Sequence, residues 1–386
     1  MDKEKYLIDY NYLYDALKTH PLLQSAEKMS EYECLASTLQ CEVQDYDSLV
    51  NTMSILTSFF KDGHTNIELP YTYDDFCIGI ICEWRDDKLF LKEKYESIEA
   101  GAEITAVEGV TPEYLLIYAA SMIPHENEYL VKSRMVEYPY KNYHIFSDMN
   151  LKRLFGDKTH YEITFKNVNK VVTKQCVLTK YDGCLDFQEK NFIYYEMQGN
   201  KAILHLDSCV YNEEYKQKLD DLAKLCKNQK IETMELDLSK NMGGSSAVID
   251  EFIKYIDTGE FRRYEMVDYS VHPPKVVTSR KDIISNNKKE LLFPKKIICR
   301  VSNTTFSSAR TFAVTLKDNH IATVIGQPTG GKPCSYGMPR RDRTPNCNIK
   351  FRVSRCLFLR PDDSLDSEMA LFPERGCTVF NRDRID

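Results

Sequence analysis

Long apolar runs and clusters of basic residues are both missing from this sequence of 386 residues. Its longest apolar runs, such as 76–82, are far shorter than the about 20 residues that span a bilayer, so we predict no membrane span. Lysine and arginine (51) are outnumbered by aspartate and glutamate (58), which gives a net charge of −7. We therefore expect no nucleic-acid partner, because phosphate recognition needs a basic patch. The first five residues lack the apolar core of a signal peptide, which predicts a cytoplasmic protein, or a secreted one if a signal peptide has been removed.

The cysteines lack metal-binding spacing, because the 13 of them form no Cys-x-x-Cys pair. Free thiols buried in a reducing compartment explain this pattern best, and a zinc site is not expected. The glycine loops fit neither Gly-x-Gly-x-x-Gly nor the phosphate-loop pattern. We therefore predict neither a metal nor an organic cofactor. The cysteines expected in buried strands are Cys77, Cys82, Cys209, Cys299 and Cys356.

The chain is long enough for two or three domains, and its apolar periodicity changes along it. Residues 1–70 carry helical patterns that end at glycine or before proline. Residues 71–185 are mainly strand-like, with hairpin signals. Residues 186–386 alternate strands and helices, with a last long strand expected at 348–359. This predicts a mixed α/β fold whose C-terminal part is a sheet covered by helices.

A pair of serines, Ser307 and Ser308, follows the predicted buried strand at 296–301 and precedes a predicted helix. A hydroxyl on such a turn is well placed for nucleophilic attack, because the amides at a helix N-terminus stabilise negative charge beside it. A serine that only caps the helix explains the same pattern. This stretch by itself leaves both interpretations open.

Three other positions carry possible chemistry. Gly243 and Gly244 follow a predicted strand, where their backbone amides could form an oxyanion hole or a phosphate nest. Lys332 lies in a second glycine-rich loop. It could be a desolvated general base with a lowered pKa, or a solvated side chain that takes no part in a reaction. His64 directly follows the helix stop Lys61-Asp62-Gly63, as a general base or as a surface or capping histidine.

Together these stretches resemble the tail-specific, or C-terminal processing, serine protease family, and within it the branch of the tricorn core and the interphotoreceptor retinoid-binding protein repeats. The resemblance implies a crotonase-like (ClpP-like) α/β catalytic domain at 186–386. It also implies a helical N-terminal segment at 1–70 and a reduced PDZ-like β region at 71–185. The matching stretches stand in the family's order: Asp62–Thr65, Ala100–Gly109, Asp237–Gly244, Thr305–Ala309 and Gly326–Pro333.

The resemblance also implies catalytic roles. Ser307 lies 25 residues before Lys332, as the nucleophile does in the lysine-type branch, and would attack a peptide carbonyl to form an acyl-enzyme. The tricorn-like branch uses a histidine as the base, which matches His64. Its orienting acid matches Glu368, five residues before Pro373. The rivals of this acid are Asp363 and Asp366.

The resemblance further implies an oxyanion hole made by the backbone amides of Gly243 or Gly244 and of Ser308. The expected partner is a peptide or an unfolded protein substrate, and an oligomer is possible. Two alternatives stay open. One is a Ser307–Lys332 dyad protease, against which Arg310 stands where the lysine-type branch has a glutamate. The other is a catalytically silent homologue that binds peptides, which the departures from the family pattern at Ser239 and Gln327 would fit. An esterase ranks last, because the Gly-x-Ser-x-Gly elbow is absent.

Overall fold

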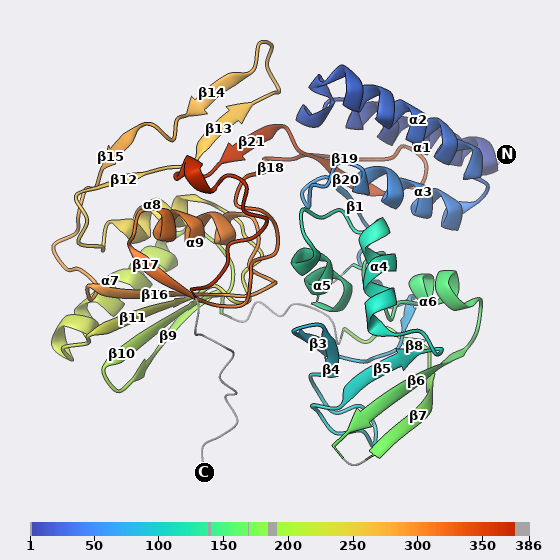
Figure 1. The fold of residues 1–386 in the computed structure, drawn as a ribbon, viewed down its shortest axis with the longest axis horizontal. Coiled ribbons are helices and arrows are strands. Elements are labelled where there is room, and N and C mark those ends of the chain that lie inside the picture. Colours follow the sequence, from blue (N-terminus) through green and yellow to red (C-terminus); the bar gives the residue numbers. More distant parts are fainter. Residues whose placement is uncertain (1, 138–139, 169, 184–190, 375–386) are drawn as a thin grey trace. The chain divides into compact units, whose positions relative to one another are not determined.

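The computed structural model describes residues 2–137, 140–168, 170–183 and 191–374. The chain forms two compact units. The first comprises Met1–Phe187 with Met338–Arg355, and the second comprises Gln188–Gly337 with Cys356–Asp386. Each unit is described by itself (Figure 1). The predicted division into three domains cuts the chain differently and stays a prediction.

The first unit begins with the predicted helices, α1 (Asp2–Leu17), α2 (Ala26–Glu42) and α3 (Tyr46–Ser58). The start of α3 is fixed by a capping box between Asp45 and Ser48, which satisfies amides that the helix itself leaves unpaired. Beyond α3, strand β1 (Asn66–Glu68) pairs antiparallel with β20 (Lys350–Val353), which pairs with β19 (Arg340–Arg343). The core between these elements is apolar and includes Leu13, Tyr32, Leu49, Met53, Phe60, Ile67 and Phe351.

The rest of the first unit holds a five-stranded sheet in which each strand pairs antiparallel with the next. The two predicted hairpins are confirmed by β3 with β4 and by β6 with β7. The expectation of a mainly β region is incomplete, because it holds two helices, α5 and α6, besides α4, which matches the helix that the sequence predicts from about Pro112. Helix α5 carries two buried basic residues, Lys132 and Arg134, which interrupt its apolar periodicity and hide it from pattern reading. The elements of this region are β2 (Phe76–Cys77), β3 (Cys82–Arg85), β4 (Lys88–Leu91), β5 (Glu103–Val107), α4 (Pro112–Met122), α5 (Glu128–Glu137), α6 (Asp148–Phe155), β6 (His160–Asn167), β7 (Lys170–Val177) and β8 (Thr179–Lys180).

The second unit is built on the predicted α/β layer. Its sheet has the order β17-β16-β11-β10-β9, and its strands run parallel except for β9. Helices α7, α8 and α9 cover one face of this sheet (Figure 1), and the core lies between them. The bounds are β9 (Ile193–Gln198), β10 (Lys201–Leu206), α7 (Glu213–Asn228), β11 (Thr233–Asp237), α8 (Ala247–Ile253), β16 (Lys296–Val301), α9 (Ser308–Asp318) and β17 (Ala322–Gly326).

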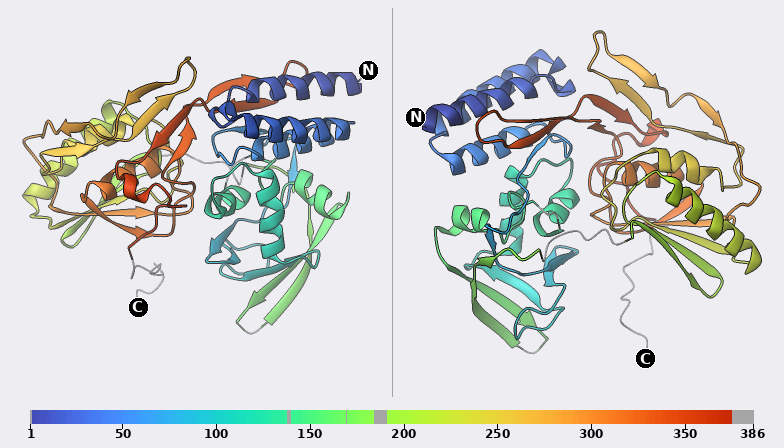
Figure 2. Two further views of the ribbon diagram at one scale, coloured as in Figure 1. Left: turned by 45° about the horizontal axis from the view of Figure 1, so that its top comes forward. Right: turned by 180° about the vertical axis from the view of Figure 1, so that it is seen from behind.

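A smaller antiparallel sheet, β14-β13-β21-β18, completes the second unit. The single long strand expected at 348–359 is wrong, because the chain leaves the strand conformation at Ser354 and Arg355. Its two halves pair in different sheets, β20 with β1 and β21 with β13, and the rear view in Figure 2 shows this connection. The remaining elements are β12 (Glu260–Arg262), β13 (Glu265–Asp268), β14 (Lys275–Thr278), β15 (Ile283–Ser285), β18 (Ser335–Gly337), β21 (Cys356–Leu359) and η2 (Asp363–Leu365).

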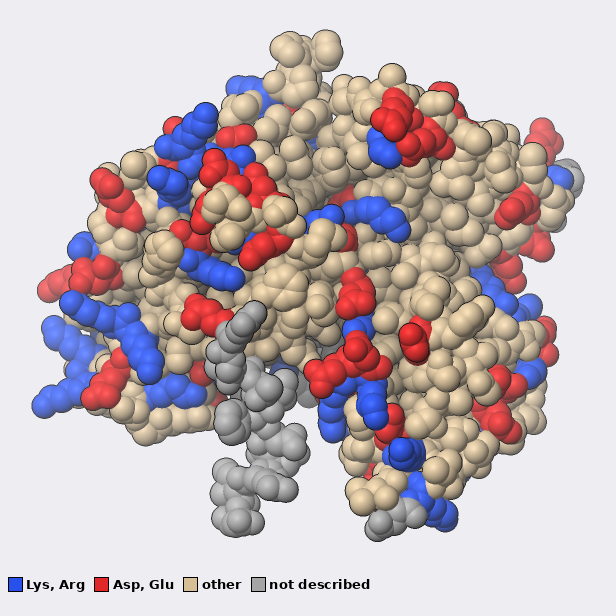
Figure 3. Space-filling view, in the orientation of Figure 1, with Lys and Arg blue, Asp and Glu red and all other residues tan. Residues whose placement is uncertain are grey.

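Surface and core agree with the composition. Acidic and basic side chains are interspersed over the face drawn in Figure 3. None of the helices in the described ranges combines the length and the apolar character that crossing a bilayer requires. The five cysteines predicted to be buried are buried free thiols, as expected.

Candidate active site

Ser307 stands at the turn between β16 and α9 in a backbone conformation that residues other than glycine rarely adopt. Its φ is 53° and its ψ is −127°. Such a conformation stores strain of about 1–3 kcal/mol and persists only where the surrounding structure holds it, most often at functional sites. Ser307 occupies the N-cap position of α9, yet its side chain makes no capping hydrogen bond with the described helix. The structure therefore does not support the interpretation of Ser307 as a helix cap.

Gly243 packs directly against Ser307. A Cβ atom at position 243 would lie 2.6 Å from the Ser307 Cβ and 3.1 Å from its Oγ. Since real Cβ atoms do not approach other heavy atoms so closely, only glycine fits here. The loop after β11 thus brings its backbone to the hydroxyl that the turn after β16 presents.

The hydrogen bonds of the two turns distinguish the oxyanion-hole candidates. The Gly243 N–H donates to Asn241 Oδ1 at 2.8 Å, so this amide is already used. The N–H groups of Gly244 and Ser308 donate to no group in the part of the chain that the structure describes. The Ser308 hydroxyl donates to the Gly244 carbonyl at 2.8 Å and ties the two turns together. Gly244 and Ser308 are therefore the available pair of donors.

Asn241 holds this loop in place, a role that the sequence analysis missed. It is fully buried, and its Nδ2 donates to the Leu206 carbonyl at 2.7 Å. Its Oδ1 accepts from Gly243, and its carbonyl accepts from the Phe306 N–H at 3.1 Å. The side chain and the backbone carbonyl of this one residue thus link the end of β10, the glycine loop and the serine turn. The signal was an asparagine inside a glycine-rich loop, because such a side chain readily bonds to backbone two residues on.

His64 belongs to the first unit and follows the turn that ends α3. The neighbouring Asp62 is fully buried, and its Oδ1 accepts from the His64 N–H at 3.0 Å and lies 3.6 Å from the His64 Nδ1. Burial raises the pKa of Asp62, but hydrogen bonds from His20 and His64 outweigh it and hold this pKa well below the usual value. Arg134 Nη2 donates to the Gly63 carbonyl at 2.6 Å and fixes the turn from α5.

One group of side chains around His64 has the composition of a cation site. Asp62, His64 and Glu126 each offer a ligand atom, and these atoms lie within 4.8 Å of one another. Two carboxylates with one imidazole would suit a divalent cation such as Zn²⁺ or Mn²⁺. The sequence analysis named none of these three residues as a ligand, because they are brought together by the fold and not by spacing.

The predicted acids and the predicted lysine lie elsewhere in the second unit. Glu368 Oε2 accepts from Arg360 Nη1 at 2.6 Å, and Asp366 accepts from Arg280 at 2.8 Å with both oxygens. Asp363 begins the short helix η2.

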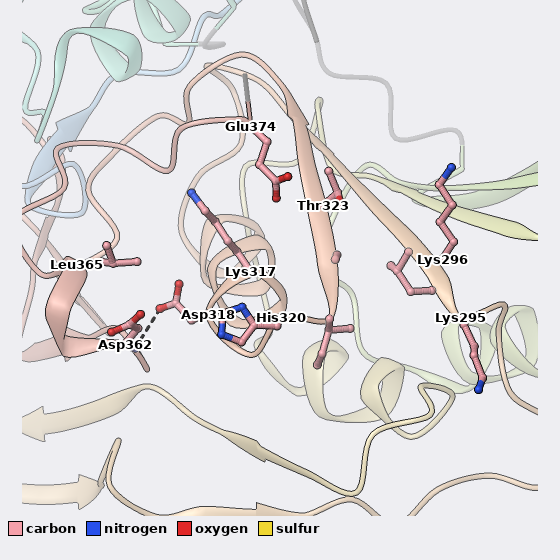
Figure 4. A pocket seen from close by; sticks show the side chains of 12 residues that line it. Lys295, Lys296, Lys317, Asp318, His320, Thr323, Asp362, Leu365 and Glu374 are labelled. Carbon is pink, nitrogen blue, oxygen red and sulfur yellow. Dashed lines mark hydrogen bonds between the residues drawn. The ribbon is translucent and has the colours of Figure 1, made fainter. Parts of the chain in front are cut away.

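The pocket in Figure 4 is a different place. It has a volume of about 410 Å³, and Lys317, Asp318, His320 and Glu374 are among its lining residues. It also includes Lys296, the first residue of β16. Ser307 follows the carboxyl end of the same strand, so this pocket is not the site of the serine turn.

Comparisons with known proteins agree with this architecture. Residues 200–354 match the model of peptidase family S41. Mature CPAF complexed with lactacystin is 12% identical, with 96% of this chain and 93% of that chain covered and a TM-score of 0.66. Mature CPAF alone is 11% identical, with coverage of 96% and 92% and a TM-score of 0.67. The photosystem II D1 C-terminal processing protease is 11% identical, with coverage of 96% and 92% and a TM-score of 0.50. These likenesses show the fold alone, and they confirm the predicted mixed α/β class.

Proposed function

We propose that this chain, whose residues 200–354 match the model of peptidase family S41, is a serine peptidase that hydrolyses peptide bonds through an acyl-enzyme on Ser307. The observation that carries this proposal is the strained turn of Ser307, with the backbone of Gly243 against its hydroxyl. A residue that only capped the helix would need neither feature.

In this proposal His64 is the general base. It takes the proton from Ser307 Oγ as the oxygen attacks the peptide carbonyl, and it then gives this proton to the departing amine. In the second half of the reaction, His64 takes a proton from the water that attacks the acyl-enzyme. It then returns this proton to Ser307 Oγ as the acyl bond breaks. The amides of Gly244 and Ser308 receive the oxyanion, and losing one such donor costs about 3 kcal/mol of transition-state stabilisation.

The family resemblance supplies the finer assignments. The sheet and helices of the second unit would be the crotonase-like catalytic domain, and the antiparallel sheet of the first unit the reduced PDZ-like region. Such a region could receive a peptide or unfolded protein substrate by strand addition. Glu368, with Asp363 and Asp366 as rivals, is the orienting acid that the resemblance assigns. A cytoplasmic location also stays a prediction.

Two alternatives use the same fold. In a Ser307–Lys332 dyad the lysine would replace His64 as the base. Against it, Arg310 stands where the lysine-type branch has a glutamate, and Arg310 is buried with its Nη2 on Ser335 Oγ at 2.6 Å. In a silent homologue the glycine loops would bind peptide without hydrolysis. The retained strain at Ser307 favours the enzyme, because a silent protein has no need of it.

Labelling with a fluorophosphonate probe tests these readings. We expect the wild type to be labelled, and Ser307→Ala and His64→Ala to lose labelling, while Lys332→Ala keeps it. Ser308→Ala is the matched control, since its hydroxyl lies one residue away and is bonded to the Gly244 carbonyl. Loss in Lys332→Ala with survival in His64→Ala would establish the dyad. A folded wild type that neither labels nor cleaves peptides would favour the silent homologue.

A further inference from the structure

We propose that Asp62 is the carboxylate that orients His64 for catalysis, and that the buried His20 keeps this carboxylate in place. This inference rests on the proposed function, because it assigns a positioning residue to the proposed base. It differs from the family resemblance, which assigns the orienting acid to Glu368. The geometry that supports it lies entirely within the first unit.

The carboxylate of Asp62 is surrounded by donors. Its Oδ2 accepts from Thr65 Oγ1 at 2.7 Å and lies 3.2 Å from His20 Nε2. Its Oδ1 accepts from the His64 N–H. Asp62, Thr65 and His20 are all fully buried. A buried carboxylate is stable as an anion only with such partners, so this site is built to hold a fixed negative charge.

The proton on His20 can be assigned from its second nitrogen. The Leu22 N–H donates to His20 Nδ1 at 3.1 Å, so this nitrogen carries no proton. A neutral imidazole then carries its proton on Nε2, which faces Asp62. His20 is therefore a neutral donor to the carboxylate. Its ring packs on Phe60 with centroids 4.5 Å apart, which restricts its rotation.

Asp62 in turn faces the ring of His64. The Oδ1–Nδ1 distance of 3.6 Å is slightly too long for a hydrogen bond, yet catalytic hydrogen bonds often tighten only when substrate is bound. A carboxylate at Nδ1 keeps the proton on that nitrogen and leaves Nε2 as the base, which is the tautomer that proton abstraction from Ser307 requires. The side chain of His64 is 12% exposed, while that of Asp62 is 0% exposed. The base is thus accessible and its orienting group is not.

Other charged groups of the first unit also face this histidine. Glu126 offers a carboxylate oxygen within 4.8 Å of the ligand atoms of both Asp62 and His64. Arg134 donates to the carbonyl of Gly63, the residue before His64. The Asp62 carboxylate is held in place by three donors, which are the Thr65 hydroxyl, the His20 ring and the His64 N–H. Asp62 is therefore the better positioning residue, and Glu126 serves as the comparison in the test.

Glu368 is committed to another partner. The Arg360 guanidinium that it accepts from is fully buried and also pairs with Asp318 at 2.6 Å. Moving Glu368 to His64 would leave part of a buried guanidinium without its acceptor, which is costly. This pairing explains why an acid chosen by spacing alone need not be the orienting acid.

The test is the pH dependence of fluorophosphonate labelling, measured as a second-order rate constant from about pH 5 to about pH 8, where an imidazole titrates. For Asp62→Asn we expect the rate to fall by about 10³–10⁴-fold. We also expect the midpoint of this pH profile to change in Asp62→Asn, because the carboxylate beside the base is gone. Glu368→Gln and Glu126→Gln should keep the wild-type midpoint. His20→Gln should stay near the wild-type rate, because its amide can donate to Asp62 in place of the imidazole.

A double variant separates positioning from folding. In Asp62→Asn alone, the new amide meets the His20 N–H donor to donor, which can unfold the turn. In His20→Gln with Asp62→Asn, the glutamine oxygen accepts from that amide and restores the hydrogen bond without the charge. We expect the double variant to unfold at the wild-type temperature and still to label slowly.

Each other outcome overturns the inference. If the double variant recovers both the melting temperature and the labelling rate, the role of Asp62 is structural. If Asp62→Asn keeps the wild-type rate and midpoint while Glu368→Gln loses them, Glu368 is the orienting acid. If Ser307→Ala labels as well as the wild type, the proposed function itself fails, and the inference fails with it. That last result is distinct, because it does not involve the first unit.

Discussion

Replacing Gly243 by alanine tests the central contact of the serine turn. The added Cβ would lie 2.6 Å from the Ser307 Cβ and 3.1 Å from the Phe306 carbonyl oxygen, at a residue whose φ is 109°. The unusual φ costs about 1–3 kcal/mol for a residue with a side chain. Overpacking adds about 1–3 kcal/mol. For a unit of this size, each kcal/mol lowers the melting temperature by about 2–4 °C, so we expect a fall of at least about 4 °C. If the turn yields instead, Ser307 moves, and a displacement of about 1 Å costs about 10²-fold in rate.

Gly259 supplies the matched control for this change. It lies in the same unit, and a Cβ there would meet nothing within 4 Å. Gly259→Ala should therefore leave both melting temperature and fluorophosphonate labelling near the wild type. If Gly243→Ala behaves like Gly259→Ala in both assays, the backbone of the glycine loop does not contact the serine, and the assignment of the oxyanion hole to this loop is refuted.

Three further predictions follow from the same contacts. Asn241→Ala should lower the free energy of unfolding by about 1–3 kcal/mol, since it leaves buried backbone groups unpaired, and it should slow labelling. Denaturant titration measures the first effect and the probe measures the second. A variant that is as stable as the wild type and labels slowly would show that Asn241 acts on the site alone. Burial raises the pKa of Asp237, but hydrogen bonds from His205 and Ser239 outweigh it and hold this pKa at about 2. Since the folded pKa lies below the unfolded one, this carboxylate contributes stability above about pH 4 that is lost as the pH falls to about 2. Asp237→Asn should therefore flatten the acid side of a stability profile, and an unchanged slope would contradict the pairing. EDTA should leave the labelling rate unchanged, because the proposed chemistry uses side chains alone; a loss that Zn²⁺ restores would show that Asp62, His64 and Glu126 hold an essential cation.

The fold was most predictable where one face of an element is uniformly apolar. Strands β10, β11 and β16 and helices α7 and α9 repeat apolar residues at the period of their own structure, and all five are found where the pattern placed them. Helix α5 was not predicted from the sequence, because the buried side chains of Lys132 and Arg134 interrupt its apolar period. The alternation of apolar and polar residues predicts one strand at 348–359. This pattern does not reveal that consecutive segments pair with strands of different sheets.

The candidate site was predictable in its positions and not in its hydrogen bonds. A strand, two serines and an apolar helix face locate Ser307, because turn chemistry is local. Whether Gly243 or Gly244 offers a free amide depends on where the Asn241 side chain accepts, and this choice is made by the Leu206 carbonyl on another strand. Sequence spacing does not tell which of the two glycine amides is bonded to Asn241, since either glycine satisfies the same pattern.

The pairing of His20 with Asp62 shows why an orienting acid is hard to find by spacing. The two residues are separated by 42 positions, and each has an ordinary local explanation, His20 before a proline and Asp62 in a helix stop. The burial of both residues shows that they form a functional pair, because a carboxylate out of contact with water needs hydrogen-bond donors or loses its charge. In this structure the donors are the Thr65 hydroxyl, the backbone of His64 and a histidine whose other nitrogen is already occupied. A motif can nominate His64 as a base, but its tautomer is decided by the hydrogen bonds that fix the charge beside it.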